Sequence, residues 1–328
     1  MQRLKSILLA CVAAGAIAGG AHADEVVLKA VTGVPAPSPV AQGFFQYMER
    51  VNERGKGIVK IDYIGGPEAT PPSRQAAALT RGIIDVLHAP SSFYAGSVKE
   101  VDVLLGVNRP VSELRTNGAF DLLNERWGEQ INAHIVSWYD TTVGFNIYTT
   151  KEPKVEGDKV SLEGMKLFTT PTYRDFQEEL GATPIAIDIA EIMTALERGV
   201  IDGFGWPNYG LVALGFGREA KYRIEPQFYS GNTPVLVNKD KWDSLPEDAK
   251  KVLTEVAIEW EAEAPAYLRA IKEKEEAELI EAGMQIYQLP PEAAATYRAT
   301  AYDVLAKRLE KAGGETGKKL WDLVHKPE

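Results

Sequence analysis

The spacing of apolar residues along the chain changes repeatedly between the two-residue period of strands and the wider period of helices. Residues 26–32 and 58–63 form apolar runs typical of strands. Between them a helix is expected from Pro39 to about Arg54, because Ser38 suits the N-cap and Pro39 the first helical position. Further strands are expected at 131–138, 142–150, 165–168 and 185–189, and further helices at 112–127 and 171–180. This alternation indicates an α/β fold.

One stretch of the pattern occurs twice. The segment 198–207 (RGVIDGFGWP) aligns without a gap on the segment 81–90 (RGIIDVLHAP). In each copy a short amphipathic run leads to a glycine, which suits the left-handed end of a helix, and then to an apolar strand closed by a proline. The repeat predicts two similar α/β units. A coincidence between common helix–strand connections stays open as the alternative.

The repeat also indicates where a ligand would bind. Ligands of open α/β sheets sit beyond the carboxyl ends of the strands, which places residues 91–94 and 206–209 at a shared cleft. Sites for small molecules are mostly apolar and aromatic, with a few polar groups. The candidate ligand-binding residues of this kind are Ser91, Tyr94, Phe168, Tyr173, Trp206, Asn208 and Tyr209, together with Glu68 on the glycine-rich turn after residue 64.

Helical composition dominates the chain after residue 244. It continues to Gly283 with one interruption at Pro265, and Ser244 and Glu247 have the spacing of a capping box at its start. An unbroken helix of this length would extend about 55 Å, enough to lie along two small domains. A last helix is expected at about 291–312, followed by a short tail.

These elements predict a two-domain α/β protein with a long helix spanning both domains. The polar segment 151–161 is the expected first crossing between the domains, and 232–238 is the expected return. The expected limits are 24–148 plus about 234–258 for the first domain, 149–233 plus the C-terminal helices for the second, and about 245–282 for the spanning helix.

The first residues have the composition of a secretory signal peptide. Arg3 and Lys5 precede an apolar run that ends at about Ala18, and Ala21-His22-Ala23 fits a small-x-small cleavage site after Ala23. Cleavage there predicts an exported, periplasmic protein. The one cysteine, Cys11, lies inside the signal, so the mature chain has no disulfide. The formal net charge of −10 argues against nucleic acid as a partner, because phosphate binding needs a basic face.

The sequence offers no constellation for catalysis. It lacks the G-x-S-x-G, H-E-x-x-H, G-x-x-x-x-G-K-S/T and G-x-G-x-x-G motifs. His88, His134 and His325 have no second histidine or cysteine at ligand spacing, so neither a metal nor a cofactor is expected. The cleft residues suit binding without reaction. The alternative, an exported enzyme with Glu68 or His88 as its base, stays open.

Several motifs together resemble one family. They are GGPE at 65–68, YAG at 94–96, LEGMKL at 162–167, TPTY at 170–173, LGATP at 180–184 and TALERGVIDGFGWP at 194–207. In this order they are similar to the extracytoplasmic solute receptors of TRAP (tripartite ATP-independent periplasmic) transporters. The resemblance implies two α/β domains that close on a small organic solute like a flytrap, a long helix spanning both, and delivery of the solute to membrane permease subunits. A receptor that signals to a membrane kinase would use the same closed state, and this alternative stays open.

The chain departs from the family pattern at Phe168. Family members usually carry an arginine there, whose planar guanidinium pairs with a ligand carboxylate through two hydrogen bonds. Losing these two charge-assisted bonds removes about 1.5–3 kcal/mol each. Either the ligand's anion is held elsewhere, or the ligand is not a simple carboxylate.

Two sets of residues could compensate for this departure. Arg174 lies in the first turn of the next predicted helix, where backbone N–H groups already favour an anion. Alternatively, an aromatic box would suit a ring-bearing or cationic ligand, with each ring contributing about 0.5–2 kcal/mol. The members of this box would be Phe168, Tyr173, Trp206 and Tyr209. The expected ligand is therefore a small organic acid with an apolar or aromatic part.

Overall fold

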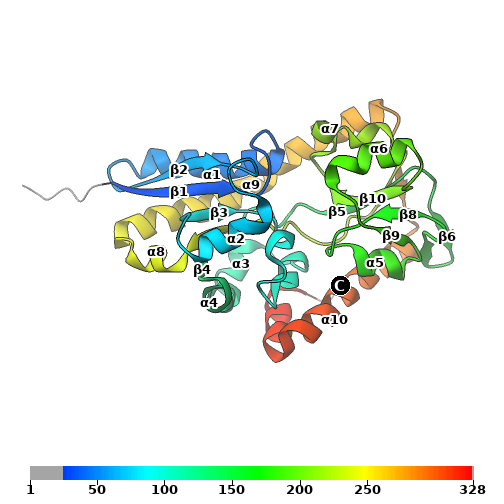
Figure 1. Cartoon of the computed structure of the whole chain (residues 1–328). Helices are drawn as coiled ribbons and strands as arrows, with labels where there is room; N and C mark the ends of the chain where they lie inside the picture. The colour runs from blue at the N-terminus through cyan, green and yellow to red at the C-terminus, as the bar shows by residue number, and fades with distance from the viewer. Residues whose placement is uncertain (1–24, 327–328) are drawn as a thin grey trace, which may run out of the picture.

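The computed structural model describes residues 25–326 and contains two separate mixed sheets, each covered by helices (Figure 1). The predicted signal peptide lies outside the described residues. We call the five-stranded sheet and its helices the first lobe. Its strand order is β2-β1-β3-β12-β4. The strands are β1 (Val26–Thr32), β2 (Val59–Gly65), β3 (Val86–His88), β4 (Ala133–Ser137) and β12 (Val235–Asn238).

The second lobe is built on a six-stranded sheet with the order β13-β11-β5-β10-β8-β9. Its strands are β5 (Phe145–Thr149), β8 (Lys166–Phe168), β9 (Thr183–Ile185), β10 (Gly203–Pro207), β11 (Tyr222–Glu225) and β13 (Gln285–Gln288). A two-stranded hairpin, β6 (Lys154–Glu156) with β7 (Lys159–Ser161), lies apart from this sheet. The two-domain α/β architecture expected from the sequence is thus confirmed.

Short helices connect and cover the strands of both lobes. Ser38 caps the first of them as predicted, since its hydroxyl accepts a hydrogen bond of 3.2 Å from the Ala41 N–H. The α-helices are α1 (Pro39–Arg54), α2 (Pro72–Thr80), α3 (Val111–Leu114), α4 (Ala119–Ile131), α5 (Arg174–Glu179), α6 (Ile192–Glu197), α7 (Leu211–Leu214) and α8 (Lys239–Ser244). The 3₁₀ turns are η1 (Ser91–Tyr94), η2 (Val101–Leu105), η3 (Ile189–Glu191) and η4 (Phe216–Arg218).

The sequence repeat has the same backbone structure in both lobes. Gly82 follows α2 with φ +67°, and Gly199 follows α6 with φ +63°. Only glycine adopts this left-handed conformation without strain, which explains the residue in each copy. The Gly82 N–H donates to the Leu79 carbonyl at 2.9 Å, and the Gly199 N–H donates to the Leu196 carbonyl at 3.0 Å.

The aspartate of each copy then bonds to the neighbouring strand. The Asp85 carboxylate accepts the Lys29 N–H at 2.8 Å, and the Asp202 carboxylate accepts the Lys166 N–H at 2.9 Å. The backbone N–H groups of the two aspartates donate in turn to the carbonyls of the same two lysines. The two copies therefore form equivalent helix–turn–strand units, and the prediction of two similar units is confirmed.

The first crossing between the lobes lies earlier in the chain than expected. β5 pairs antiparallel with β10, so residues 145–149 belong to the second sheet. The chain therefore leaves the first lobe at 138–144, and the placement of the crossing at 151–161 was wrong. That segment is polar because it forms the exposed β6–β7 hairpin. The observed crossing contains buried residues, and its last part was expected to belong to a strand at 142–150.

The predicted long helix is present as α9 (Glu247–Glu281), with Pro265 inside it. Its 35 residues extend about 52 Å. Val252 and Trp260 pack in an apolar cluster of the first lobe, whereas Leu279 packs in a cluster of the second lobe. The helix therefore spans both lobes.

The predicted capping box at the start of this helix does not form. Ser244 ends α8 instead, and its hydroxyl donates to the Lys241 carbonyl at 2.7 Å. α9 begins after Pro246, whose fixed φ suits a helix start without a side-chain cap. The sequence pattern was ambiguous because two helices meet within three residues.

Two buried acids attach α9 to the two lobes. The Glu261 carboxylate accepts two hydrogen bonds from Arg115, at 2.6 and 2.8 Å, and one of 2.7 Å from the Trp138 N–H in the first lobe. The Glu275 carboxylate accepts the N–H groups of Gly210 and Val212 in the second lobe, at 2.5 and 2.6 Å. The two acids lie about four helical turns apart and so face the same side of α9.

The last helix is longer than predicted and reaches the first lobe. α10 (Pro291–Val324) has a break at Gly314, where φ is 56° and ψ is −139°. Leu320 and Val324 beyond the break pack in an apolar cluster of the first lobe. The assignment of all C-terminal helices to the second domain was therefore wrong. Two adjacent glycines, typical of a helix end, hid an amphipathic continuation.

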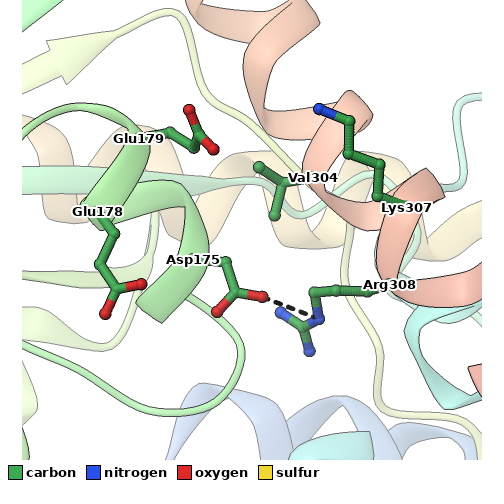
Figure 2. A pocket seen from close by; sticks show the side chains of 6 residues that line it. All are labelled: Asp175, Glu178, Glu179, Val304, Lys307 and Arg308. Carbon is green, nitrogen blue, oxygen red and sulfur yellow. Dashed lines mark ion pairs between the residues drawn. The ribbon is translucent and has the colours of Figure 1, made fainter. Parts of the chain in front are cut away.

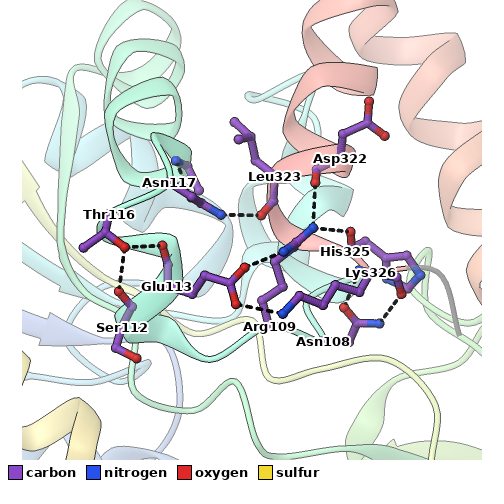
Figure 3. Close-up of polar contacts among 11 residues, drawn as sticks. Asn108, Arg109, Ser112, Glu113, Thr116, Asn117, Asp322, Leu323, His325 and Lys326 are labelled. Carbon is purple, nitrogen blue, oxygen red and sulfur yellow. Dashed lines mark hydrogen bonds and ion pairs between the residues drawn. The ribbon is translucent and has the colours of Figure 1, made fainter.

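Polar contacts anchor the end of α10 to the first lobe (Figure 3). Lys326 forms an ion pair of 2.9 Å with Glu113, and its carbonyl accepts a hydrogen bond of 2.7 Å from Asn108. The Asn117 side chain donates to the Leu323 carbonyl at 2.8 Å. The part that the sequence predicts as a short tail is thus a docked structural element.

We expect Glu261→Ala to lower the free energy of unfolding by about 3–5 kcal/mol, because it leaves the half-buried Arg115 guanidinium without its carboxylate. Urea-induced unfolding followed by circular dichroism measures the change. Glu263→Ala is the matched control two residues along α9. Its ion pair with Arg50 is solvent-exposed, so its loss should cost less than about 1 kcal/mol. Equal effects of the two substitutions would contradict the role given to Glu261.

Candidate functional site

The first lobe contributes η1, which follows β3 and carries two candidate residues. Ser91 is buried, and its hydroxyl accepts a hydrogen bond of 2.8 Å from the Asn232 side chain. Tyr94 is 2% exposed, and its hydroxyl has no hydrogen-bond partner of ordinary length among the described residues. Burial raises the pKa of Tyr94, while the nearby Trp127 indole lowers it and the Asp140 carboxylate raises it further. Both residues thus lie against the segments that cross between the lobes.

Glu68 is not brought together with the other candidates by any contact in the structure. Its side chain is exposed, and one carboxylate oxygen accepts the N–H of Gly66 in its own turn at 2.6 Å. This hydrogen bond lowers the pKa of the Glu68 carboxyl. The residue stabilises the glycine-rich turn.

Phe168 ends β8 and lies inside the second lobe. Its side chain is 1% exposed and belongs to an apolar cluster with Tyr148 and Phe204. The aromatic ring that stands where the family carries arginine is therefore a core side chain in this structure. Trp206, at the end of β10, is only partly buried and packs edge-on against Phe216 with ring centres 5.2 Å apart.

Tyr173 packs on the backbone of β10. A Cβ atom at Gly205 would meet the Tyr173 ring at 2.9 Å, so glycine is required for this contact. The ring also lies 5.7 Å from that of Phe145, and burial raises the pKa of the Tyr173 hydroxyl. Tyr173 therefore links the turn after β8 to the strands β5 and β10.

Arg174 begins α5 with an exposed side chain. Its guanidinium lies 3.6 Å from the Glu178 carboxylate, one turn along the same helix. This ion pair is on the solvent-exposed face, since both side chains are about half exposed. Arg174 is therefore engaged in a surface ion pair within its own helix.

The segment after β10 joins the second lobe to the crossings and to the first lobe. The Asn208 side chain donates to Gln227 at 2.6 Å, and the Asn208 N–H donates to the Gly144 carbonyl at 2.9 Å. Tyr209 is buried in an apolar cluster of the first lobe that also contains Trp260. Burial raises the pKa of its hydroxyl, and the Asp140 carboxylate adds to the shift. The Asp140 carboxylate therefore raises the pKa of both the Tyr94 and the Tyr209 hydroxyl.

Sequence reasoning did not single out the polar residues that connect the two crossings. Asp140 lies on the first crossing and is 3% exposed. One of its carboxylate oxygens accepts the Thr233 N–H on the second crossing at 3.0 Å, and the other is buried without a hydrogen-bond partner among the described residues. Burial raises the pKa of Asp140 to about 6, although the Thr233 N–H and hydroxyl lower it. An acid directly after Trp138-Tyr139 in an apolar run was the available signal.

The two crossings also touch through their backbones. A Cβ atom at Gly231 would come within 2.0 Å of the Asp140 carbonyl, so this position requires glycine. The Trp138 indole N–H donates to the Gly231 carbonyl at 3.0 Å. The crossings therefore form one packed unit.

His88 is buried at the end of β3. Its ring stacks between Phe44, 5.1 Å away, and Tyr139, 5.6 Å away, and its Nε2 is 2.8 Å from the Tyr139 hydroxyl. Burial lowers the pKa of His88 to about 3, so the imidazole is neutral at physiological pH. This environment is that of a structural histidine.

One hollow lies between α5 and α10 (Figure 2). Its volume is about 440 Å³. It is lined by Asp175, Glu178, Glu179, Val304, Lys307 and Arg308. Across residues 25–326, no three histidine, cysteine or acidic side chains are arranged to hold a metal ion. Over the same residues, no helix combines the length and the apolar character needed to cross a membrane.

We expect Asp140→Asn to change the pH dependence of stability. The folded pKa of about 6 exceeds the unfolded value of about 3.9, so the folded state binds the proton more tightly and loses stability as pH rises through this window. The asparagine variant should therefore gain about 3 kcal/mol relative to the parent between pH 4 and pH 7. Urea unfolding at a series of pH values measures this difference. Asp62→Asn, on the exposed face of β2, is the control and should follow the parent at every pH.

Comparison with known proteins places the chain in a family. A model described as "Bacterial extracellular solute-binding protein, family 7" matches residues 30–312. The C4-dicarboxylate-binding periplasmic protein DctP of Rhodobacter capsulatus is 22% identical over 309 residues, which cover 90% of each chain.

Solved structures agree with this assignment. An apo open TRAP periplasmic solute binding protein from Marinobacter aquaeolei is 16% identical, with a TM-score of 0.79 over 92% of this chain and 100% of that chain. A TRAP periplasmic solute binding protein from Rhodoferax ferrireducens with bound malonate is 19% identical, with a TM-score of 0.76 over 90% and 96%. The chain belongs to the bacterial extracellular solute-binding protein family 7, the solute receptors of TRAP transporters.

Proposed function

We propose that this receptor captures a small organic acid with an apolar or aromatic part between its two lobes and releases it unchanged to the TRAP permease. The observation that carries the proposal is the family match over residues 30–312, together with two α/β lobes joined by α9. Export after cleavage at Ala23 is part of the proposal. It is supported by the signal pattern and by the periplasmic proteins among the relatives.

The ligands of the relatives define the substrate class to be tested. Structures of TRAP solute binding proteins contain malonate in the Rhodoferax protein, orotic acid in a Desulfovibrio salexigens protein and β-D-galacturonate in a Sulfitobacter protein. A relative from Ruegeria pomeroyi, 25% identical over 167 residues, is an ectoine/5-hydroxyectoine-binding protein. These ligands share a carboxylate and differ in ring and charge.

Within the second lobe, Trp206 is the aromatic candidate best placed to meet a ligand. It lies near the carboxyl end of β10 and stays partly exposed, whereas Phe168 and Tyr173 are buried. We assign ligand stacking to Trp206, and orientation to Asn208, Tyr209, Tyr94 and Ser91. Phe168 would support Trp206 from inside the same apolar cluster.

The geometry offers no support for the enzymatic alternative. His88 is buried, neutral and stacked between two rings, so it is not placed to accept a proton from a ligand. Glu68 caps its own turn, and its pKa is lowered, which weakens it as a base. Binding without turnover is the chemistry that the remaining residues suit.

Native mass spectrometry of freshly purified protein is expected to show a bound small molecule that is recovered unaltered after denaturation. Calorimetric titration with malonate, orotate, pyroglutamate, galacturonate and ectoine then identifies the preferred class. Saturable binding of at least one carboxylate is expected. Absence of both a retained molecule and saturable binding would contradict the proposal, and a chemically altered product would favour an enzyme.

Trp206→Ala should weaken binding of the retained ligand at least tenfold, equivalent to about 1.4 kcal/mol, because it removes a stacking surface. Calorimetry measures the change in Kd. Trp242→Ala is the control, since Trp242 lies on α8 of the first lobe and stacks on His134 of β4 with 4.1 Å between ring centres. Equal losses in the two variants would show that Trp206 acts only through stability.

A further inference from the structure

α10 passes from one lobe to the other close to residue 308. Tyr297 and Leu305 pack in an apolar cluster of the second lobe, together with Leu167 of β8. Leu309, one turn further along the helix, packs in a cluster of the first lobe. A residue between these two positions lies at the junction of the lobes.

Arg308 occupies this junction and bonds in both directions. Its guanidinium donates to the Asp102 carboxylate of η2 at 2.8 Å, and to the Pro171 carbonyl in the turn after β8 at 2.8 Å. The Asp175 carboxylate of α5 lies 3.7 Å from its Nε (Figure 2). One planar, always charged group thus contacts the 3₁₀ turn η2, the turn after β8 and the start of α5.

The partners of Arg308 belong to different moving parts. Val101 and Val103, on either side of Asp102, pack in the apolar cluster of the first lobe. Pro171 lies in the turn that carries Tyr173, a candidate ligand residue of the second lobe. Hinge closure of two-lobed receptors changes the relative position of such segments. The bonds of Arg308 therefore depend on the relative orientation of the lobes.

The ion pair between Arg308 and Asp102 is shielded enough from water to influence the relative orientation of the lobes. The Arg308 and Asp102 side chains are 22% and 15% exposed, so water screens their attraction less than it screens a surface pair. Breaking it would leave the Asp102 carboxylate largely buried without its partner. By contrast, the Arg174–Glu178 pair on the neighbouring α5 is about half exposed and lies within one helix.

We propose that Arg308 is a conformational latch that holds the turn after β8 against the first lobe and fixes the relative orientation of the lobes in the ligand-free receptor. A ligand that draws this turn towards itself must work against the latch. The latch thereby sets the balance between orientations before any ligand arrives.

The test measures the distance between the lobes directly. Protein expressed from Asp24 onward has no cysteine of its own, so two introduced cysteines can carry spin labels selectively. Ala77→Cys on α2 and Thr194→Cys on α6 are suitable, because both positions are exposed and equivalent in the repeat. Double electron–electron resonance on the ligand-free, ligand-stripped protein gives the distribution of distances between the labels.

Arg308→Met should broaden the distance distribution and shift its mean relative to the parent, and Asp102→Asn should do the same by removing the charge of the partner. Arg174→Met is the matched control and should leave the distribution unchanged. Thermal melts by circular dichroism verify that each variant is folded at the measuring temperature. If Arg308→Met fails to fold, Asp102→Asn, which keeps the size of the side chain, decides the question.

A folded variant with the distribution of the parent would overturn the latch. An equal shift in the Arg174→Met control would overturn it as well, because the effect would then be one of surface charge. The experiment needs no ligand. A failure here therefore leaves the proposed substrate class untouched, and a failure to find a ligand leaves the latch testable.

Discussion

Two buried carboxylates on one side of α9 hold this receptor together as a single molecule. Glu261 binds the first lobe through Arg115, and Glu275 binds the second lobe through the N-terminus of α7. A buried carboxylate is costly unless its oxygens are satisfied, so each acid fixes the helix against its lobe with directional bonds. Most of the buried apolar residues of the helix contact the first lobe, and Leu279 packs in the second, so the second acid adds directional bonds where the apolar contact is smaller.

The covalent crossings contribute the complementary constraint. They are short and packed against each other, with Asp140 on one bonded to Thr233 on the other. A long helix attached to both lobes, together with two short connections packed against each other, leaves few directions for relative motion of the lobes. Rotation about the crossings is compatible with both, whereas sliding of the lobes would break the bonds of Glu261 or Glu275. The candidate residues Tyr94 and Tyr209 lie close to Asp140 on the first of these crossings.

Local sequence patterns predicted the helices and strands whose limits are set by neighbouring residues. β1 and α1 were placed within a residue or less of their observed limits because a run of apolar residues and the pair Ser38-Pro39 specify them directly. The duplicated turn was visible because glycine and aspartate have fixed backbone roles in it. The sheet to which β5 belongs could not be predicted, since a fully buried strand carries no mark of its partner. Phe168 was expected to face a ligand because it lies at a strand end. The direction of its side chain, however, depends on tertiary packing, which the sequence pattern does not specify.

In the candidate site, too, residues placed by local sequence were predicted, whereas residues that depend on remote partners were not. Trp206 and Asn208 were predicted at the carboxyl end of β10, and the structure has them there. Asp140, Thr233 and Arg308 were not singled out, because each acts through a partner that is remote in sequence. Arg308 lies in a helical stretch rich in lysine and glutamate, where one arginine looks like any other surface charge.

The docking of Lys326 has a practical meaning for anyone who handles this protein. Both Val26 in β1 and Lys326 after α10 belong to the first lobe, so the two described ends of the chain leave the molecule from the same half. Immobilising the protein on a sensor chip through either terminus therefore attaches the first lobe to the surface. The second lobe is then the part that can move relative to the surface.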